Sequence, residues 1–415
     1  MTSDHAAPTE MQFLGKYRLL ARLGTGGMAE VLLGRLDGPA GFSKHFAIKR
    51  MRPELTTHRE FVDLFLEEAR TASLLSHANI CQVNELNVEG GDYFMVLEYL
   101  DGIAVSSALI KSLADPRALP IPFMVGIIQQ ASEGLHYAHG VADEHGVPYT
   151  IVHRDISPPN LFITTGGVVK VLDFGISKSR ESVVKTLTGQ IRGKFAYMSP
   201  EQLRGEKLDQ RSDVFSLAIV TFEILTGRRL FRRKTRLEVF KAIVREPIPA
   251  PIDVREDLPP RLSAVVERAL ARNRDERYDS AREFGDALAE SIRDLGGPMQ
   301  VPDVGDLVRE KFPAELAAKR QLLTHPPGVQ LSAPPLPGSG ALGTQPTKRL
   351  LKPGETVPDA RVGEIDTDDY INTANETNVW SRGEVTSIDL KQGDGDVIDD
   401  GSASGSDEPD GSREP

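Results

Sequence analysis

The sequence predicts an α+β fold in two lobes, because strand-like segments dominate its first hundred residues and helical segments dominate the next two hundred. Short apolar runs of the strand type cover 17–23, 31–34, 46–49 and 94–97. Apolar residues with helical spacing occur once in this first part, at 61–75, and then repeatedly at 123–139, 213–226, 236–245 and 261–270. We therefore expect a β-rich N-terminal lobe with one main helix, followed by a helical C-terminal lobe.

The composition is that of a cytoplasmic protein that is not built around disulfides or a membrane span. Cys81 is the only cysteine among 415 residues, which excludes an intramolecular disulfide and a cysteine-based metal site. The first ten residues lack a secretory signal, and no run of 18 apolar residues predicts a transmembrane helix. Of the net charge of −11, residues 355–415 carry 17 acidic and four basic side chains. The rest is nearly neutral, so nucleic acid is not an expected partner.

A glycine-rich turn and a strand-terminal lysine form the first candidate site. Gly24, Gly26 and Gly27 lie between two strand-like runs, where a turn without side chains brings backbone N–H groups close to phosphate oxygens. Taken alone, a plain glycine-rich hairpin is the commoner explanation. Lys49 ends the next apolar strand, and an enclosed ammonium requires a partner. Of the adjacent carboxylates Glu67 and Glu68 on the helix at 61–75, we expect Glu68 to provide it.

A second candidate site follows from two motifs in the helical part. His153-Arg154-Asp155 precedes Asn160 by five residues, and Asp173-Phe174-Gly175 begins 18 residues after Asp155. By residue type and spacing, Asp155 is placed to accept or orient the proton of an attacking hydroxyl. Asn160 and Asp173 supply oxygen ligands suited to Mg²⁺, a metal that keeps water and bridges phosphates.

Two further residues are predicted to hold this part of the chain together. Glu201, in the segment Gly193-Lys-Phe-Ala-Tyr-Met-Ser-Pro-Glu201, needs a cation if it is buried, and Arg277 is the candidate. Asp213 opens a helical segment and is expected to cap the first N–H groups of that helix.

With these motifs in order, residues 17 to about 290 resemble a bacterial Hanks-type (eukaryotic-like) Ser/Thr protein kinase domain. The resemblance implies a bilobal protein-kinase fold that transfers the γ-phosphoryl group of ATP to a protein Ser/Thr hydroxyl, with Mg²⁺ or Mn²⁺ as the metal. It implies that the three glycines lie over the phosphates and that Lys49, held by Glu68, contacts the α- and β-phosphates. It also implies an adenine pocket made by Val31, Ala47, the gatekeeper Leu97, the hinge backbone from Glu98 to Leu100, and Phe162. The Glu201–Arg277 pair and Asp213, as an anchor, are structural ties that the resemblance implies as well.

The sequence departs from the family pattern at three positions. Ala29 replaces the third glycine, Ser157 replaces the lysine that approaches the transferred phosphoryl group, and Lys194 replaces a threonine in the substrate-facing loop. We expect Lys194 to return a cation to the catalytic site, with a purely structural Ser157–Lys194 hydrogen bond as the alternative. The alternative for the whole chain is a pseudokinase or scaffold. Ala196 and Tyr197 do not follow the tyrosine-kinase pattern, so the loop favours Ser/Thr transfer.

Phosphorylation is the expected mode of regulation. In the family, an Arg before the catalytic Asp, here Arg154, goes with activation by phosphorylation of the activation segment. Thr186 and Thr188 lie eight and six residues before Lys194, at spacings typical of autophosphorylated threonines in bacterial relatives. The alternative is that these are plain solvated hydroxyls.

The expected organisation has four parts. Residues 1–16 form a flexible N-terminus, 17–292 the kinase domain, 293–324 a short helical extension, and 325–415 a Pro/Gly-rich linker with an acidic disordered tail. We expect the extension to pack on the helical lobe, with docking to a partner as the alternative. Protein substrates are the expected partners. The lone tryptophan, Trp380, marks a segment for a partner or a contact in cis, unless it is simply solvated.

Overall fold

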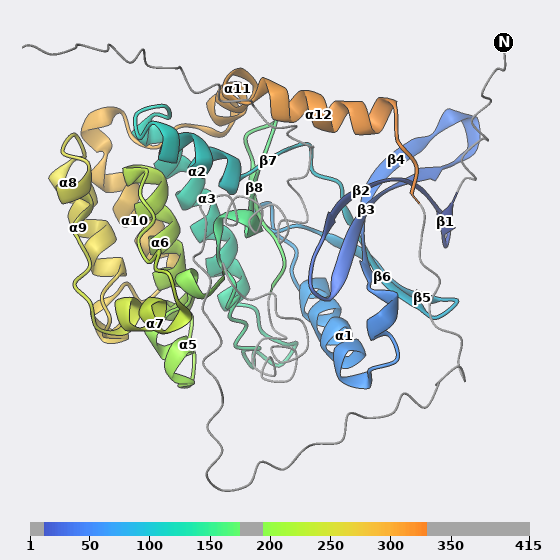
Figure 1. Cartoon of the computed structure of the whole chain (residues 1–415), viewed down its shortest axis with the longest axis horizontal. Helices are drawn as coiled ribbons and strands as arrows, with labels where there is room; N and C mark the ends of the chain where they lie inside the picture. The colour runs from blue at the N-terminus through green and yellow to red at the C-terminus, as the bar shows by residue number, and fades with distance from the viewer. Residues whose placement is uncertain (1–11, 175–193, 330–415) are drawn as a thin grey trace, which may run out of the picture. The chain divides into compact units, whose positions relative to one another are not determined.

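The structure is a computed structural model that describes residues 12–174 and 194–329 (Figure 1). Its N-terminal lobe is built on a six-stranded antiparallel sheet of order β1-β2-β3-β4-β6-β5. The strands are β1 (Phe13–Leu14), β2 (Tyr17–Thr25), β3 (Ala29–Asp37), β4 (Ser43–Met51), β5 (Val83–Glu89) and β6 (Asp92–Glu98).

One helix covers this sheet, α1 (Arg59–Ser73). Its buried face repeats every four residues, at Phe61, Phe65 and Ala69, and packs on Met51 and Met95 of the central strands. The single helix and the strands agree with the predicted β-rich lobe.

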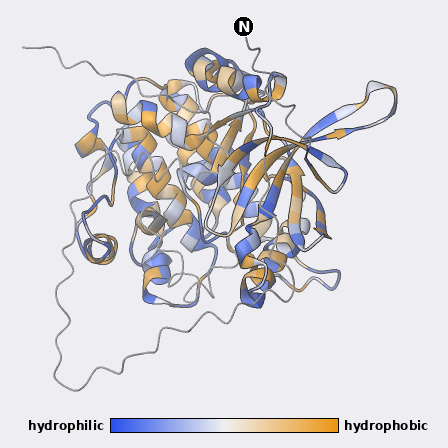
Figure 2. Cartoon of the chain, turned by 45° about the vertical axis from the view of Figure 1, so that its right-hand side comes forward, coloured by the Kyte–Doolittle hydropathy of each residue, from blue (hydrophilic) through white to orange (hydrophobic). Residues whose placement is uncertain are grey.

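The C-terminal lobe is helical and is organised around α6 (Arg211–Thr226), whose residues from Ser212 to Thr226 are all buried. Figure 2 shows hydrophobic residues concentrated in the helices at the centre of this lobe and in the strands of the sheet. The other helices are α2 (Val105–Ala114), α3 (Ile121–His139), α5 (Pro200–Arg204), α7 (Arg236–Val244), α8 (Pro251–Val254), α9 (Pro260–Ala269) and α10 (Ala281–Ser291).

A small sheet lies where the two lobes meet. It consists of β7 (Gly102–Ala104), β8 (Leu161–Thr164) and β9 (Val169–Val171), in that order. Short 3₁₀ helices occur at Pro39–Gly41, Pro53–Leu55, Pro158–Asn160, Lys194–Tyr197, Arg274–Glu276 and Arg293–Leu295. The predicted α+β fold in two lobes is therefore confirmed. Across the described residues, no helix is both long enough and apolar enough to cross a membrane.

The ends of the described chain differ from the expectation in two places. Phe13 and Leu14, expected to be flexible, pair with Arg18 and Tyr17 as an edge strand. Residues 325–329, expected to begin the linker, contact the sheet instead: the Gly328 N–H donates to the Leu20 carbonyl at 3.0 Å, and Val329 is buried against the N-terminal lobe. The polar residues around Phe13 and Leu14 and the Pro/Gly content after His325 concealed these contacts. The remainder of the predicted tail, with Trp380, lies outside the described residues.

The extension after α10 contains two helices, α11 (Val301–Lys311) and α12 (Pro313–Thr324), and Pro313 occupies the first turn of α12. Val304, Val308 and Leu316 pack into the core of the helical lobe, as expected. The second half of α12 does more, because it leaves that lobe and packs on β2 and β7. Figure 1 shows α12 running from the helical lobe toward the sheet. The sequence did not indicate that α12 contacts both lobes.

Candidate active site

Lys49 is held at the centre of the candidate site by two carboxylates from different parts of the fold. Its side chain projects from β4, and the Nζ atom lies 2.5 Å from Glu68 Oε1 on α1 and 2.9 Å from Asp173 Oδ1. Burial by itself would lower the pKa of Lys49, but the charges of Asp173 and Glu68 outweigh it, so the pKa lies above its usual range. The predicted Lys49–Glu68 contact is present, and the lysine remains charged.

Asp155 and Asn160 face each other across the loop that precedes β8. The Asn160 Nδ2 group donates to the backbone oxygen of Asp155 at 2.7 Å and to its Oδ2 at 3.0 Å. The 3₁₀ turn Pro158–Asn160 fixes this geometry, with proline at its first positions. Because the amide nitrogen faces Asp155, the amide oxygen of Asn160 is the atom that can coordinate a metal.

Asp213 holds the start of this loop through hydrogen bonds to its backbone. Its Oδ2 accepts the backbone N–H of His153 at 2.7 Å and its Oδ1 accepts that of Arg154 at 2.9 Å, while His139 Nε2 lies 2.8 Å from Oδ2. Burial would raise the pKa of Asp213, but these bonds, led by that with His139, lower it below its usual value. A buried carboxylate with three donors is favoured as the anion, so it fixes the loop that carries Asp155.

The expected role of Asp213 as a helix cap was wrong. α6 begins two residues earlier, at Arg211, and Gln210 occupies the cap position without a side-chain cap bond. Asp213 therefore lies inside the first turn, and its carboxylate reaches across to another segment. A sequence pattern specifies an acidic residue near a helix start, but it does not say which N–H groups that residue accepts.

Two non-glycine residues beside the site adopt left-handed backbone conformations. Arg154 has φ of 64° and Asp173 has φ of 50°. Such conformations are costly for residues with a side chain and persist where the surroundings enforce them. Here they direct the backbone immediately before Asp155 and at the second candidate metal ligand.

The glycine-rich turn joins β2 to β3 as predicted. The Gly26 N–H donates to the Ala29 carbonyl at 2.7 Å, and Gly24 pairs with Val31 across the ladder. Gly27 lies in the turn itself, between the two strands. The Ala29 side chain points into the core formed with Phe61 and Met51, away from the turn.

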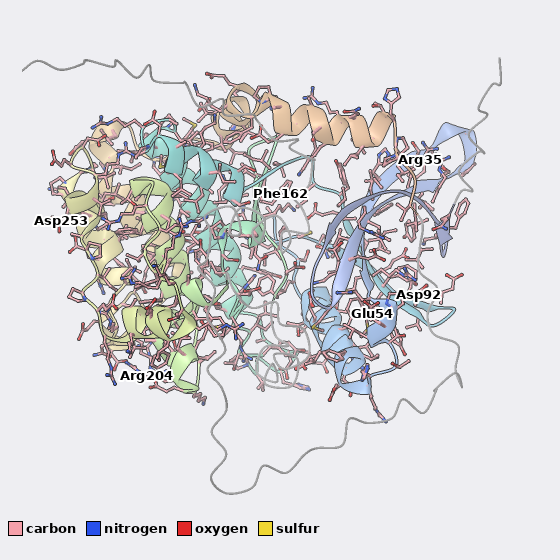
Figure 3. The ribbon with its side chains drawn as sticks, in the orientation of Figure 1. Arg35, Glu54, Asp92, Phe162, Arg204 and Asp253 are labelled. Atoms are coloured by element: carbon pink, nitrogen blue, oxygen red, sulfur yellow. The ribbon has the colours of Figure 1, made fainter. Side chains whose placement is uncertain are left out.

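The residues expected to hold adenine form one apolar cluster. Val31, Ala47, Leu97, Leu100 and Phe162 are all buried in it. In Figure 3, Phe162 lies between the two lobes. The hinge residue Glu98 turns its carboxylate away, toward Lys170 at 2.7 Å and the Gln82 N–H at 2.8 Å, so its backbone is what it offers to a ligand.

The oxygen donors fit a magnesium ion that is completed by phosphates. Asn160 and Asp173 offer an amide oxygen and a carboxylate, the hard ligands that Mg²⁺ prefers. Across the ranges 12–174 and 194–329, no group of three or more His, Cys, Asp or Glu side chains is arranged to hold a metal. A site with two protein ligands leaves coordination positions for water and for oxygens of a substrate, as Mg²⁺ on a nucleotide has.

Several predicted residues are described only in part. Ser157 is buried, and its hydroxyl donates to the backbone oxygen of Asp155 at 3.4 Å. Lys194 begins a 3₁₀ turn, but its side chain lies outside the described residues, as do Thr186 and Thr188 in full. The exchange between Ser157 and Lys194 therefore remains a prediction.

The predicted pair between Glu201 and Arg277 is present and is bidentate. Arg277 NH1 lies 2.7 Å from Oε1 and NH2 lies 2.9 Å from Oε2. Burial would raise the pKa of Glu201, but the Arg277 guanidinium lowers it overall, and Ser212 donates a further hydrogen bond at 2.7 Å. The pair joins α5 to the segment that follows the 3₁₀ turn Arg274–Glu276.

Sequence reasoning missed three residues around the site. Gln202 on α5 donates to the Arg154 carbonyl at 2.9 Å and ties α5 to the loop that carries Asp155. His139 supports Asp213, as described above. Lys319 on α12 places its Nζ 4.3 Å from the centre of the Phe162 ring. Gln202 and His139 act through contacts distant in sequence, and Lys319 lies in a segment without any motif.

Comparisons with known proteins find similarity across both lobes. A family model for the protein kinase domain matches residues 17–286. The tyrosine-protein kinase MasK of Myxococcus xanthus is 40% identical over 311 residues, 75% of this chain and 48% of MasK. The match therefore spans about half of that relative.

Two further proteins resemble the same region. The serine/threonine-protein kinase PknA of Mycobacterium tuberculosis is 32% identical over 312 residues, 74% of this chain and 68% of PknA. The crystal structure of the Mycobacterium tuberculosis PknI kinase domain superposes with a TM-score of 0.52 at 27% identity. It covers 69% of this chain and 100% of that domain.

Proposed function

The chain belongs to the protein kinase family and has its two-lobed fold, and from this premise we propose that it is an ATP-dependent serine/threonine protein kinase. The proposal is that it transfers the γ-phosphoryl group of ATP directly to a protein hydroxyl, with no covalent enzyme intermediate. The observation that carries the proposal is the single cluster of Lys49 with Glu68 and Asp173, beside the facing pair of Asp155 and Asn160.

Each residue of this cluster has a role that its contacts support. Lys49, kept charged between two carboxylates, orients the α- and β-phosphates beneath Gly24, Gly26 and Gly27. Asp155, steadied by Asn160, orients the attacking hydroxyl and takes its proton. Val31, Ala47, Leu97, Leu100 and Phe162, with the backbone of Glu98, hold the adenine. Mg²⁺ bound by Asn160 and Asp173 would neutralise phosphate charge when present.

The direct test is the mass of the purified full chain after incubation with ATP and Mg²⁺. We expect the wild type to gain phosphate, because autophosphorylation needs no added substrate. Asp155→Asn removes the proton acceptor and should slow the gain about 10²–10⁴-fold, and Asp173→Asn should abolish it by removing a metal ligand. If the wild type gains no phosphate but ADP still raises its Tm, the pseudokinase alternative holds.

The acceptor residue distinguishes two candidate activities. Similarity to the serine/threonine-protein kinase PknA and the Ala196-Tyr197 pattern support serine or threonine as the acceptor. Similarity to the tyrosine-protein kinase MasK, which is 40% identical, favours tyrosine. Mapping the phosphates of the autophosphorylated chain by fragmentation separates the two. Phosphate confined to Ser and Thr supports our proposal, and phosphate on any of the eight Tyr residues as the main product overturns the serine/threonine part of it.

The unusual pair Ser157 and Lys194 has a proposed catalytic role of its own. We infer that Lys194 supplies the cation that the family places at position 157. Loss of a charge-assisted contact costs about 1.5–3 kcal/mol, so Lys194→Thr should slow transfer roughly ten- to a hundredfold. Adding Ser157→Lys to Lys194→Thr should restore much of the rate. No recovery in the double variant would favour a purely structural role.

Phosphorylation of Thr186 and Thr188 is the proposed switch. Arg154 supports it, because its Nε is buried and has no hydrogen-bond partner among the described residues. A phosphate brings about two negative charges and strong acceptors that such a donor can bind. After phosphatase treatment and renewed incubation with ATP, the Thr186→Ala/Thr188→Ala variant should remain less active than the wild type. Equal activities would rule out the switch.

A further inference from the structure

Helix α12 lies against the part of the fold that the proposed function assigns to adenine. Leu322 and Leu323 pack on the apolar cluster that contains Val31, Ala47 and Phe162. The same helix contacts β2, which leads into the glycine turn, and β7, which follows the hinge. α12 thus contacts the apolar cluster itself, the strand that leads into the glycine turn, and the strand that follows the hinge.

Lys319 is the residue of α12 that lies against the Phe162 ring. Its side chain is 8% exposed, and its Nζ lies 4.3 Å from the centre of the Phe162 ring. A cation at this distance over an aromatic face is attracted by the ring electrons. The Phe162 ring is fully buried by protein atoms, so a base could stack on it only after some of these atoms move.

The surroundings of Lys319 are energetically unfavourable for a charged side chain. Among the described residues, no carboxylate lies within ion-pairing distance of Lys319 Nζ, and Asp101 acts on it only from farther away. Asp101 accepts a hydrogen bond from Thr165 through Oδ2, while its Oδ1 is buried without a partner in the described part of the chain. A buried cation and a buried carboxylate oxygen are therefore both left incompletely satisfied, which is costly.

Burial of the adenine residues by the protein's own atoms points the same way. Val31, Ala47, Leu100 and Phe162 are each at most 4% exposed, and Leu23, just before the glycine turn, is 5% exposed. A planar base cannot enter between such residues unless part of their cover is displaced. α12 is the part of that cover that lies outside the region matched to the kinase family, residues 17–286.

We propose that α12 is a built-in competitor of ATP, with Lys319, Leu322 and Leu323 occupying the space of the adenine base, so that nucleotide binds only when α12 moves away. The proposal rests on the proposed function, because it takes the cluster around Phe162 to be the adenine site. Its consequence is an equilibrium between a docked state that excludes nucleotide and an undocked state that binds it. The apparent affinity for nucleotide then falls with the undocked fraction.

The test compares ADP affinity in full-length variants by calorimetry in Mg²⁺. Lys319→Glu places a carboxylate over the ring face and near Asp101, and should undock α12. Leu322→Asp/Leu323→Asp should undock it through lost apolar contact. Both should bind ADP about tenfold or more tightly than the wild type. Arg320→Glu is the matched control, because it makes the same charge change one residue away on an exposed position and should bind as the wild type does.

A second measurement does not depend on the variants folding alike. Hydrogen exchange of the α12 amides in the wild type should become faster when ADP is added, since bound nucleotide holds α12 away. ADP affinity that is unchanged in the two undocking variants overturns the proposal, as does weaker binding, which would make α12 part of the nucleotide site. Protection of α12 by ADP overturns it as well. If ADP binds to no form of the chain, the kinase function itself fails, and the role of α12 fails with it.

Discussion

The base of the helical lobe and the hinge side under α12 each bury a cation over an aromatic ring, yet they treat it differently. Arg277 stacks 4.7 Å from the Phe215 ring centre and also has both oxygens of Glu201. Lys319 lies 4.3 Å from the Phe162 ring centre with no ion-pair partner in the described ranges. The first arrangement is satisfied on all sides, and the second is not.

The carboxylates of the two regions show the same contrast. Asp213 accepts three hydrogen bonds at 2.7–2.9 Å, whereas Asp101 leaves Oδ1 buried and unpartnered among the described residues. A buried polar group that is fully bonded favours a single structure, and one that is partly bonded lowers the stability of the structure that buries it. Under our proposal, the first region stays in place and the second can separate from the site.

Arg277→Met tests the permanent region and should have the largest effect. Methionine fills a similar volume but leaves Glu201 buried without its cation, which costs about 3–5 kcal/mol of unfolding free energy. Urea unfolding followed by circular dichroism measures this cost. Arg282→Met is the control, because its pair with Glu133 is exposed and should contribute little. Similar losses in both variants would erase the contrast.

Asp213→Asn should have the next largest effect. The asparagine amide has the shape of the carboxylate, but its N–H group faces the backbone N–H donors of His153 and Arg154. We expect this to lower the unfolding free energy by about 1.5–3 kcal/mol. Because the pKa of Asp213 is lowered in the folded protein, the carboxylate stabilises the fold above its unfolded pKa, and this is lost as pH falls through the folded pKa. Wild-type stability should therefore decline more steeply in acid than that of the variant. Parallel pH profiles would contradict this.

Lys319→Met tests the releasable region, and its sign is opposite to that of Lys319→Glu. Burial lowers the pKa of Lys319 to about 7 against an attraction by Asp101, so charge opposes docking and an apolar side chain should favour it. ADP should bind about tenfold more weakly to the methionine variant at pH 7. Tighter binding would mean that the cation itself holds α12 in place.

The same pKa predicts how nucleotide affinity depends on pH. Between pH 7 and the ordinary lysine pKa of 10.5, undocked Lys319 binds more protons than docked Lys319. Docking therefore strengthens as pH rises through this window, and ADP affinity should fall from pH 7 to pH 9 in the wild type. The affinity of Lys319→Met should stay nearly constant over that range. A wild-type profile as flat as that of the variant would contradict the prediction. Among the described residues, Asp101 is the charged group that acts on the pKa of Lys319, and it raises that pKa.

Asp101→Asn should have the smallest effect. Its unpartnered oxygen makes no bond that the amide would lose, so stability should stay within about 0.5 kcal/mol of the wild type. Loss of the distant attraction to Lys319 should make ADP binding slightly tighter, as calorimetry would show. A stability loss as large as that of Asp213→Asn would show that Asp101 has a structural role.

Much of this architecture followed from local sequence patterns. Helical spacing at 61–75 and the apolar run ending at Lys49 placed both members of the Lys49–Glu68 pair on the correct elements. Such patterns report on burial and periodicity within one element, which is why they succeeded there. The bidentate partner of Glu201 was also foreseen, because a buried carboxylate needs a cation.

Other features depend on contacts that no local pattern specifies. The local pattern predicted that Asp213 caps its own helix, and only the family resemblance gave it as an anchor; it binds a loop sixty residues earlier in the chain. The amphipathic spacing around Val304 and Leu316 indicated packing on the helical lobe, but the more polar second half of α12 did not indicate the site at Phe162. A buried lysine is not recognisable from sequence, since lysines are mostly exposed.

The hydrogen bond between Gly328 and Leu20 has a mechanical consequence for the whole molecule. Because this bond fastens the end of the described chain to β2, two stretches of backbone span the lobes within residues 12–174 and 194–329: the hinge after β6 and the strap formed by α12. One connection alone permits twisting and opening about many axes. Two parallel connections act as a linkage, which restricts the lobes to the few motions that keep both lengths constant.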